Sequence, residues 1–118
     1  MKTLVIGASE NRDRYSNMAI RELRTHGHEV VAVGIKKGQV EDVFIETEIH
    51  SINNIHTISI YLNPERQQAF YNQLLQLKPN RIIFNPGTEN ATFKQLAKNS
   101  GVEVLEACTL VMLRTGQY

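Results

Sequence analysis

Leu4 to Asn17 have the sequence LVIGASENRDRYSN, and this stretch decides the fold. The apolar run Thr3–Ile6, closed by a glycine, is typical of a strand buried on both faces. Between residues 16 and 26 the apolar side chains return at helical spacing, with Ser16 as the expected N-cap and Gly27 as the expected stop. The stretch therefore predicts a strand, a loop and a helix in that order.

The same alternation continues along the chain. Further strands are expected at residues 29–33, 57–62, 81–84 and 102–105, and further helices at 65–77, 92–100 and 109–113. The segment 34–54 holds only weak apolar patches, and no element is assigned to it. Five strands alternating with helices predict an α/β fold, a Rossmann-like doubly wound open sheet of about five mostly parallel strands with helices on both faces. At 118 residues, the chain is expected to form a single domain over residues 1–118.

The composition narrows the function classes. A formal net charge of +1 gives no global basic field for nucleic acid, so any anion site must be local. Cys108 is the single cysteine, which rules out an intrachain disulfide or a cysteine zinc cluster and favours a reducing setting. No run approaches the roughly 18 apolar residues of a membrane helix, and the apolar start is too short for a signal peptide. We therefore expect a cytoplasmic protein that binds neither nucleic acid nor membrane.

In open parallel sheets, ligands bind outside the carboxyl ends of the strands. The residues expected there, besides the segment 34–37, are Gly7, Ala8, Ser9, Asn63, Pro64, Asn85, Pro86 and Gly87. Gly7 allows a sharp turn, and the amides from Ser9 onward are able to line a concavity for phosphate. A dinucleotide fingerprint needs G-x-G-x-x-G, of which only the first glycine is present, so the alternative is a plain strand-to-helix turn without a ligand.

The end of the second strand bears on the type of nucleotide. An acidic residue there would hold the ribose of NAD, but the chain continues Val33-Gly34-Ile35-Lys36-Lys37, which counts against NAD. Lys36 and Lys37 suit a nucleotide with an extra phosphate near its ribose, as in NADP or coenzyme A. The alternative is a solvated pair of surface lysines.

The sequence shows no catalytic apparatus. The histidines have no metal spacing and are interpreted as structural or surface residues: His26, His28, His50 and His56. Cys108 is expected to pack against the core rather than to attack a substrate. Paired carboxylates, a Walker lysine and a G-x-S-x-G elbow are absent, which favours a binding protein over an enzyme.

The motifs resemble those of a known family. IGASENRDRYSN, from Ile6 to Asn17, resembles the opening motif of small stand-alone CoA-binding proteins. VAVGIKK (31–37) resembles their second strand and turn, although Gly34-Ile35 stand where relatives often have asparagine-proline, and FNPGTEN (84–90) resembles the loop after their fourth strand. Over essentially the whole chain the sequence is similar to the CoA-binding domain of the succinyl-CoA synthetase α subunit, reduced to its Rossmann-like part.

The resemblance implies that the loop after the first strand holds the pyrophosphate of CoA. Backbone amides at Gly7 and Ser9 would approach the phosphates, while Arg12 and Arg14 would offset their charge. Tyr15 would border the adenine or the pantetheine.

The resemblance also implies contacts at the helix N-terminus and at the second strand end. Ser16 and Asn17 would hydrogen-bond phosphate where the helix dipole favours anions. Lys36 and Lys37 would meet the 3′-phosphate. The two acidic residues of the first loop oppose this arrangement unless they point outward.

The leading interpretation is a non-catalytic CoA or acyl-CoA binding protein, whose partner is a small nucleotide ligand. One alternative is an enzyme, either NADP-linked or a partner-dependent acyl-CoA ligase subunit. Another is a regulatory interaction module with a degenerate nucleotide site, for which Gly34 is the best support. The apolar segment Leu110 to Leu113 needs a cover, so a homodimer is a further hypothesis.

Overall fold

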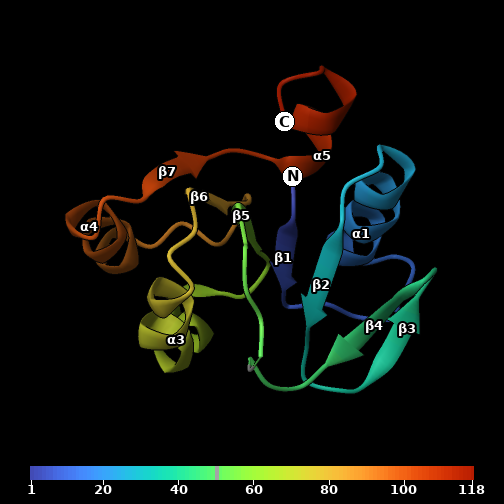
Figure 1. The fold of residues 1–118 in the computed structure, drawn as a ribbon, viewed down its shortest axis with the longest axis horizontal. Helices are drawn as coiled ribbons and strands as arrows, with labels where there is room; N and C mark the ends of the chain where they lie inside the picture. Colours follow the sequence, from blue (N-terminus) through green and yellow to red (C-terminus); the bar gives the residue numbers. More distant parts are fainter. Residues whose placement is uncertain (50) are drawn as a thin grey trace.

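The computed structural model describes residues 1–49 and 51–118, which form one sheet with helices on both faces (Figure 1). The strands are β1 (Thr3–Ile6), β2 (Val30–Val33), β3 (Gly38–Val40), β4 (Val43–Glu46), β5 (Thr57–Ile60), β6 (Arg81–Phe84) and β7 (Glu103–Glu106). The helices are α1 (Tyr15–Thr25), α2 (Pro64–Gln67), the 3-10 turn η1 (Gln68–Phe70), α3 (Tyr71–Gln76), α4 (Ala91–Asn99) and α5 (Thr109–Arg114). The predicted α/β class and the mostly parallel sheet are confirmed.

The order of the strands places the topological switch point of the sheet beside β1. The sheet has the order β3-β4-β2-β1-β5-β6-β7, so β1 lies in its middle. It pairs in parallel with β2 and with β5, and Ile6 is in register with both Val33 and Ile60. The chain builds outward to β2 and β4 and then returns to β5, β6 and β7 on the other side. Strand order therefore reverses between β1 and β5, and doubly wound sheets bind ligands at the carboxyl ends of such strands.

The described residues form seven strands, two more than the sequence predicts. The additional pair is the hairpin β3–β4, which lies in the segment left without an assigned element. β4 pairs in parallel with β2, and β3 runs antiparallel to β4 at the edge of the sheet. Only Val43 and Ile45 of β4 point into the core, while Phe44 and Glu46 are exposed. Such short, half-exposed strands carry little sequence signal because their pairing depends on tertiary neighbours.

Two predicted helix boundaries also differ from the structure. The expectation that Ser16 caps the first helix is wrong, because α1 begins at Tyr15 with Arg14 as its N-cap, and Ser16 is a buried residue of the first turn. The single helix predicted at 65–77 is interrupted by η1, whose 3-10 geometry separates α2 from α3.

Each face of the sheet has its own apolar core. On one face, Ile20 and Leu23 of α1 pack against Val5 of β1. On the other face, α3 and α4 cover β5 and β6, and Phe93 of α4 joins the cluster around Ile60. β1 and β5 are buried along their whole length, which explains their uninterrupted apolar or small side chains.

Helix α5 is covered within the chain itself. Leu110, Met112 and Leu113 are buried, and Val111 is exposed. The segment that was expected to need a second copy as its cover is thus buried within its own chain, where α5 packs against α1. Self-association stays a prediction.

Candidate functional site

The candidate site lies at the carboxyl ends of β1, β2 and β5 and involves two loops. The first loop, residues 7–14, joins β1 to α1, and the second loop, residues 34–37, joins β2 to β3. The amides of Gly7 and Ala8 both donate to the carbonyl oxygen of Val33 at 2.9 Å, so the two loops leave the sheet in contact. In Figure 1 the arrows of β1 and β2 point toward this edge, called here the carboxyl edge.

Gly7 is required by the packing of the strand ends. Its φ is +94°, and a Cβ at this position would lie 2.8 Å from the backbone carbonyl carbon and oxygen of Tyr61, the residue after β5. Any other residue would adopt an unfavourable backbone conformation and collide with main-chain atoms. The predicted turn is therefore present, and the close approach of β1 to β5 is its physical reason.

Gly34 likewise has a packing reason. A Cβ at Gly34 would lie 2.3 Å from the carbonyl oxygen of Ala8 and 3.2 Å from the side chain of Ile45. The second loop therefore rests directly on the first loop, and a side chain at position 34 would push them apart. This contact is a packing reason for a glycine at position 34.

Hydrogen bonds from α1 fix the shape of the first loop. Asn17 donates through Nδ2 to the carbonyl oxygen of Ser9 at 2.9 Å, and its Oδ1 accepts Nε of Arg21 at 2.8 Å. Arg21 also donates to the carbonyl oxygen of Arg12 at 3.2 Å. Asn17 is buried, and both ends of its amide are engaged. In this structure Asn17 holds the loop, and its predicted contact with phosphate stays a prediction.

Four basic side chains project from the two loops without acidic partners. These exposed residues are Arg12, Arg14, Lys36 and Lys37. Within the described residues, none of the four forms an ion pair, whereas ion pairs elsewhere use Lys2, Arg24, Lys94 and Arg114. The two loops thus carry four exposed cations without ion pairs, although Glu10 and Asp13 also lie in the first loop. Arg66, Lys78 and Lys98 are likewise exposed and form no ion pair among the described residues.

The other side chains of the two loops complete the surface. Glu10 is turned toward β3, where its carboxylate accepts the backbone amide of Gln39 at 2.9 Å. Asp13 is exposed. Tyr15 is 69% exposed and Ile35 is 77% exposed, so both leave apolar surface open to solvent. The edge therefore combines exposed cations with exposed apolar groups.

Four of the predicted residues lie in or beside the loops after β5 and β6. Asn63 caps α2, because its Oδ1 accepts the amide of Arg66 at 2.9 Å, and Pro64 takes the first helical position. Gly87 has a φ of +91° with open space around it, and its amide donates to Glu89 Oε1 at 2.9 Å. Pro86 beside it is exposed. These residues lie at the same edge of the sheet as the first loop.

The side chain of Asn85 is buried and forms hydrogen bonds inside the protein. Its Nδ2 donates to Ser59 Oγ and to the carbonyl oxygen of Ile60, both at 2.9 Å. Its Oδ1 accepts the amide of Thr109 at 2.8 Å, which ties the start of α5 to β5 and β6. With its amide satisfied inside the protein, Asn85 supports the edge, and its predicted contact with a ligand is untested.

A buried polar network that the sequence analysis missed joins the loops after β5 and β6. Gln67 is fully buried and donates to the carbonyl oxygens of Leu62 and Thr88, both at 2.8 Å. Asn90 donates to Gln67 Oε1 at 2.9 Å and to the hydroxyl of Tyr71 at 2.8 Å. The sequence did contain one sign that Gln67 is buried. Gln67 lies seven residues before Leu74 and therefore falls on the same inward face of the helix predicted at 65–77.

Two titratable side chains, Tyr61 and Cys108, lie near the start of α5. The hydroxyl of Tyr61 is buried without a hydrogen-bond partner in the described part of the chain, and burial raises the pKa of Tyr61. It is therefore protonated at neutral pH. Cys108 is half-buried and forms the N-cap of α5.

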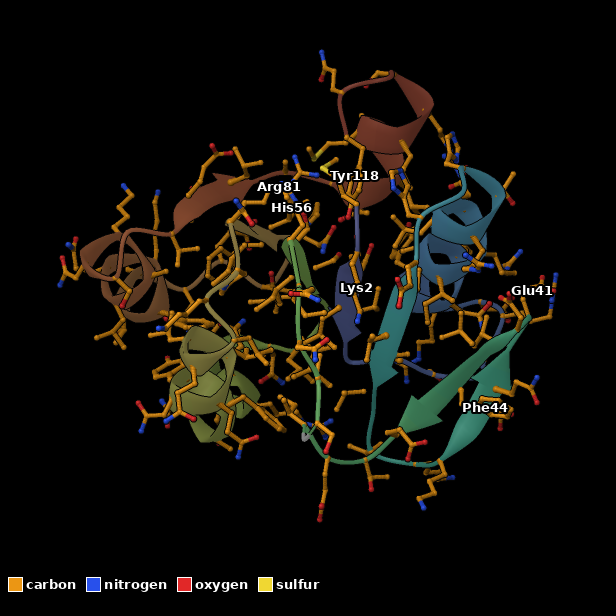
Figure 2. All side chains as sticks on the ribbon, in the orientation of Figure 1. Lys2, Glu41, Phe44, His56, Arg81 and Tyr118 are labelled. Atoms are coloured by element: carbon orange, nitrogen blue, oxygen red, sulfur yellow. The ribbon has the colours of Figure 1, made fainter. Side chains whose placement is uncertain are left out.

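The described histidines lie at the opposite end of the strands, the amino edge. The amino group of Met1 contacts His28 Nδ1 at 2.7 Å, and His56 Nδ1 lies 2.8 Å from the hydroxyl of Thr57. Figure 2 shows His56 beside Arg81 and Tyr118. Burial is the main cause that lowers the pKa of His28 and of His56. His50, interpreted with the other histidines, lies outside the described residues.

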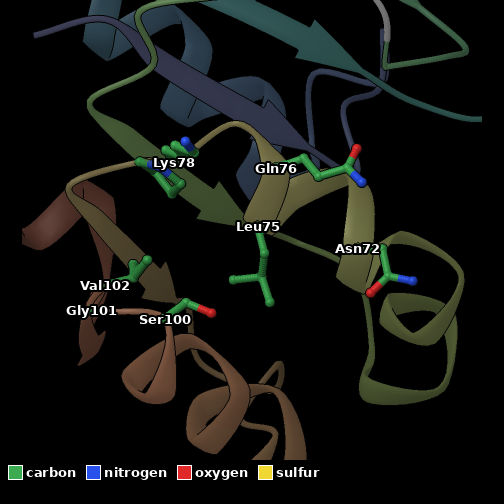
Figure 3. Close-up of a pocket in the computed structure, with 8 residues that line it drawn as sticks. Asn72, Leu75, Gln76, Lys78, Ser100, Gly101 and Val102 are labelled. Atoms are coloured by element: carbon green, nitrogen blue, oxygen red, sulfur yellow. The ribbon is translucent and has the colours of Figure 1, made fainter.

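Two open grooves also lie at the amino edge, away from the two loops. One, of about 580 Å³, is lined by residues from the end of α3 and the turn between α4 and β7, including Gln76, Lys78 and Ser100 (Figure 3). The other, of about 460 Å³, lies between residues 54–56 and 77–80. Across residues 1–49 and 51–118, no cluster of three or more His, Cys, Asp or Glu is placed to hold a metal ion. The helices of these ranges are too short or too polar to cross a membrane.

Comparison with known proteins identifies the family. A family model described as a CoA binding domain matches residues 1–114. A crystal structure of an uncharacterized protein is 44% identical, with a TM-score of 0.96 over 99% of this chain and 97% of that chain. Structures from Thermus thermophilus (17% identity, TM-score 0.86, 99% of this chain and 90% of that one) and Pyrococcus horikoshii OT3 (20%, 0.86, 96% and 81%) share the fold. No curated protein matches. The chain belongs to the CoA-binding domain family.

Proposed function

We propose that the chain binds CoA or an acyl-CoA at the carboxyl edge, between the first and second loops, without catalysing a reaction. The observation that carries the proposal is the set of four exposed cations, which have no acidic partner among the described residues and stand on two loops that pack against each other. Such a surface lowers its electrostatic free energy when it binds a polyanion. Family membership supplies the ligand class.

The first loop is suited to the pyrophosphate. It leads into α1, an 11-residue helix whose N-terminus points its amides and the positive end of its dipole at this edge. Arg12 and Arg14 add mobile guanidinium groups that bind phosphate oxygens in pairs. Because Asn17 and Arg21 already hold the backbone of the loop, the ligand does not have to order it.

The second loop is suited to the ribose phosphate, and Tyr15 and Ile35 to the apolar parts. Lys36 and Lys37 are exposed and follow the strand end where dinucleotide folds meet the ribose. The same pair would accept the 2′-phosphate of NADP, which keeps NADP as the second candidate. Tyr15 and Ile35 offer an aromatic and an aliphatic surface for the adenine or the pantetheine.

The placement of titratable groups supports binding over catalysis. His28 and His56 contact residues of the amino edge, and the Tyr61 hydroxyl is buried and protonated. Apart from the carboxylates of Glu10 and Asp13, the charged groups of the two loops are guanidinium and ammonium groups, which bind phosphate but do not exchange protons near neutral pH. The remaining alternative is an acyl-CoA ligase activity that needs a partner protein. Turnover of a carboxylic acid, CoA and a nucleotide that occurs only when the partner is added would reveal this activity.

The first test is calorimetric titration with CoA, dephospho-CoA and NADP side by side. We expect saturable binding of CoA that weakens when the 3′-phosphate is removed. Preference for NADP would redirect the search to redox chemistry. No heat with any of the three, on protein verified as folded, would contradict the proposal and favour a scaffold that binds another protein.

Matched variants locate the site. Lys36→Ala/Lys37→Ala should weaken the binding of CoA and leave the binding of dephospho-CoA nearly unchanged, because the proposed partner of the two lysines is the ribose phosphate that dephospho-CoA lacks. The control is Lys78→Ala/Lys98→Ala, which removes the same charge from exposed positions elsewhere on the surface. Equal weakening by both double variants would show a general electrostatic effect and not a site.

A further inference from the structure

Glu10 is an acidic residue in a loop proposed to hold phosphates, and the structure gives its side chain a specific contact. Its Oε2 accepts the backbone amide of Gln39, in β3, at 2.9 Å. A Cβ at Gly38 would lie 2.4 Å from Glu10 Cδ, so the carboxylate lies flat on the glycine. Glu10 therefore bridges the first loop to the strand that follows the second loop.

The bridge is the last of three successive contacts between the two loops. Gly7 and Ala8 donate to Val33, and the carbonyl oxygen of Ala8 rests on Gly34. Lys36 and Lys37 lie between the contact at Gly34 and the contact at Gln39. The turn that carries the lysines is consequently held at both ends by the loop that carries the arginines.

We propose that Glu10 is a positioning residue that fixes the spacing between the arginines of the first loop and the lysines of the second loop. This inference rests on the proposed function and deepens it. A fixed spacing selects ligands with two separated phosphate groups, a pyrophosphate and a ribose phosphate, over ligands with the pyrophosphate alone. The negative charge of Glu10 opposes any anion nearby, whereas its hydrogen bond to Gln39 favours the two-phosphate ligand. Substitutions can separate the two contributions.

The experiment compares Glu10→Gln with Glu10→Ala by calorimetry with CoA and dephospho-CoA. Glutamine keeps an acceptor for the Gln39 amide and removes the charge, so both ligands should bind as tightly as before or tighter. Alanine removes the acceptor, so CoA should lose about tenfold in affinity, the value of one charge-assisted contact, while dephospho-CoA should change little. Hydrogen exchange of the Gln39 backbone amide, measured without ligand, should stay slow in Glu10→Gln and become fast in Glu10→Ala.

Two further variants serve as controls. Asp13→Ala removes an equal charge from the same loop, but its side chain makes no contact with β3 among the hydrogen bonds of the described residues. Asp13→Ala should leave the Gln39 backbone amide protected from hydrogen exchange and should change the affinities for CoA and dephospho-CoA by the same factor. Gly38→Ala keeps the charge of Glu10 but displaces its side chain, and the clash involves only that flexible side chain. It should reproduce the loss of CoA preference seen in Glu10→Ala.

The outcomes separate the two levels of the argument. If the unmodified protein binds neither ligand, the proposed function fails, and the inference falls with it. If the protein prefers CoA, but Glu10→Ala and Gly38→Ala keep that preference or leave Gln39 protected, the positioning role alone is overturned.

Discussion

The two ends of the parallel strands differ in their ion pairs, although Lys78 and Arg81 of the amino edge also form none among the described residues. At the amino edge, Lys2 lies 3.5 Å from Glu29, and Arg24 forms a two-pronged ion pair with Asp42. The hydrogen bond from Arg24 lowers the pKa of Asp42, as a paired carboxylate requires. At the carboxyl edge, the four cations of the first and second loops have no carboxylate partner in the described ranges.

The difference separates charge used for structure from charge available to a ligand. The loops of the carboxyl edge are held by backbone contacts at glycines and by Asn17, so they do not need their cations for shape. A rigid backbone with unpaired cations is what an anion site requires. The two grooves, in contrast, lie at the amino edge, away from the four cations of the two loops.

The largest expected effect comes from Gly7→Val, which tests whether the carboxyl edge depends on backbone contact. We expect a loss of about 2–5 kcal/mol in the free energy of unfolding, because a β-branched residue at positive φ would also collide with Tyr61. Urea denaturation measures this loss. The matched control is Gly87→Ala, which has a similar φ but open space, and it should cost about 1–2 kcal/mol. Equal losses in the two variants would mean that the contact with Tyr61 contributes nothing.

The next effect concerns Asn85, predicted as a ligand contact and found as a buried anchor. Asn85→Ala should lower the free energy of unfolding by about 2–4 kcal/mol without any ligand, because buried groups of Ile60 and Thr109 lose their partner. Asn63→Ala, which removes only an exposed helix cap, should cost about 1 kcal/mol. A stable Asn85→Ala protein that fails to bind CoA would reverse this assignment and make Asn85 a ligand contact.

A smaller effect tests the electrostatic contrast between the edges. Arg12→Ala/Arg14→Ala should reduce CoA affinity by about 10- to 100-fold, and the residual affinity should depend less on salt. The free energy of unfolding should change by less than about 0.5 kcal/mol, because both side chains are exposed and unpaired in the described structure. A large loss of stability would show that the arginines serve the fold after all.

The smallest effect belongs to the amino edge and depends on pH. The folded-state pKa values of His28 and His56 lie below the ordinary 6.5, so the unfolded chain binds protons more readily there. Stability should be complete above about pH 6.5 and decline as the pH falls from 6.5 toward the folded values. In His28→Gln/His56→Gln the decline between pH 7 and 5 should flatten, with CoA binding at pH 7.5 unchanged. An unaltered pH profile in urea denaturation would contradict the assignment.

Much of the fold could be predicted because its main signals are local. β1 and β6 have the predicted bounds, and the five expected strands are all present, because buried parallel strands are continuous apolar runs. The hairpin β3–β4 could not be found in this way, since its strands are short and only alternate positions such as Val43 are buried. Ser16 has the chemistry of a cap, but the packing of α1 on the sheet buries it in the first turn.

The candidate site likewise has features that the sequence predicts and features that depend on contacts between distant residues. The position of the loops follows from the topology, so the strand-end residues could be named from the sequence. The roles of Asn85 and Asn17 could not be predicted in this way, because Asn85 bonds to groups of other elements and Asn17 donates to Ser9 across the loop. Only the bond from Arg21 to Asn17 is local to α1. The reason for Gly34 is also non-local, since its neighbour Ala8 belongs to another strand end.

The bridge from Glu10 to Gln39 has a consequence beyond the ligand. β3 is one of the two edge strands of the sheet, with β7 at the other edge, and the open amides of an edge strand are a template on which a second chain can add and aggregate. β3 is only three residues long, and the amide of its central residue is already occupied by a carboxylate of the same chain. A growing β-aggregate would have to displace that charged group, so the Glu10 side chain also protects the β3 edge of the sheet from pairing with another chain.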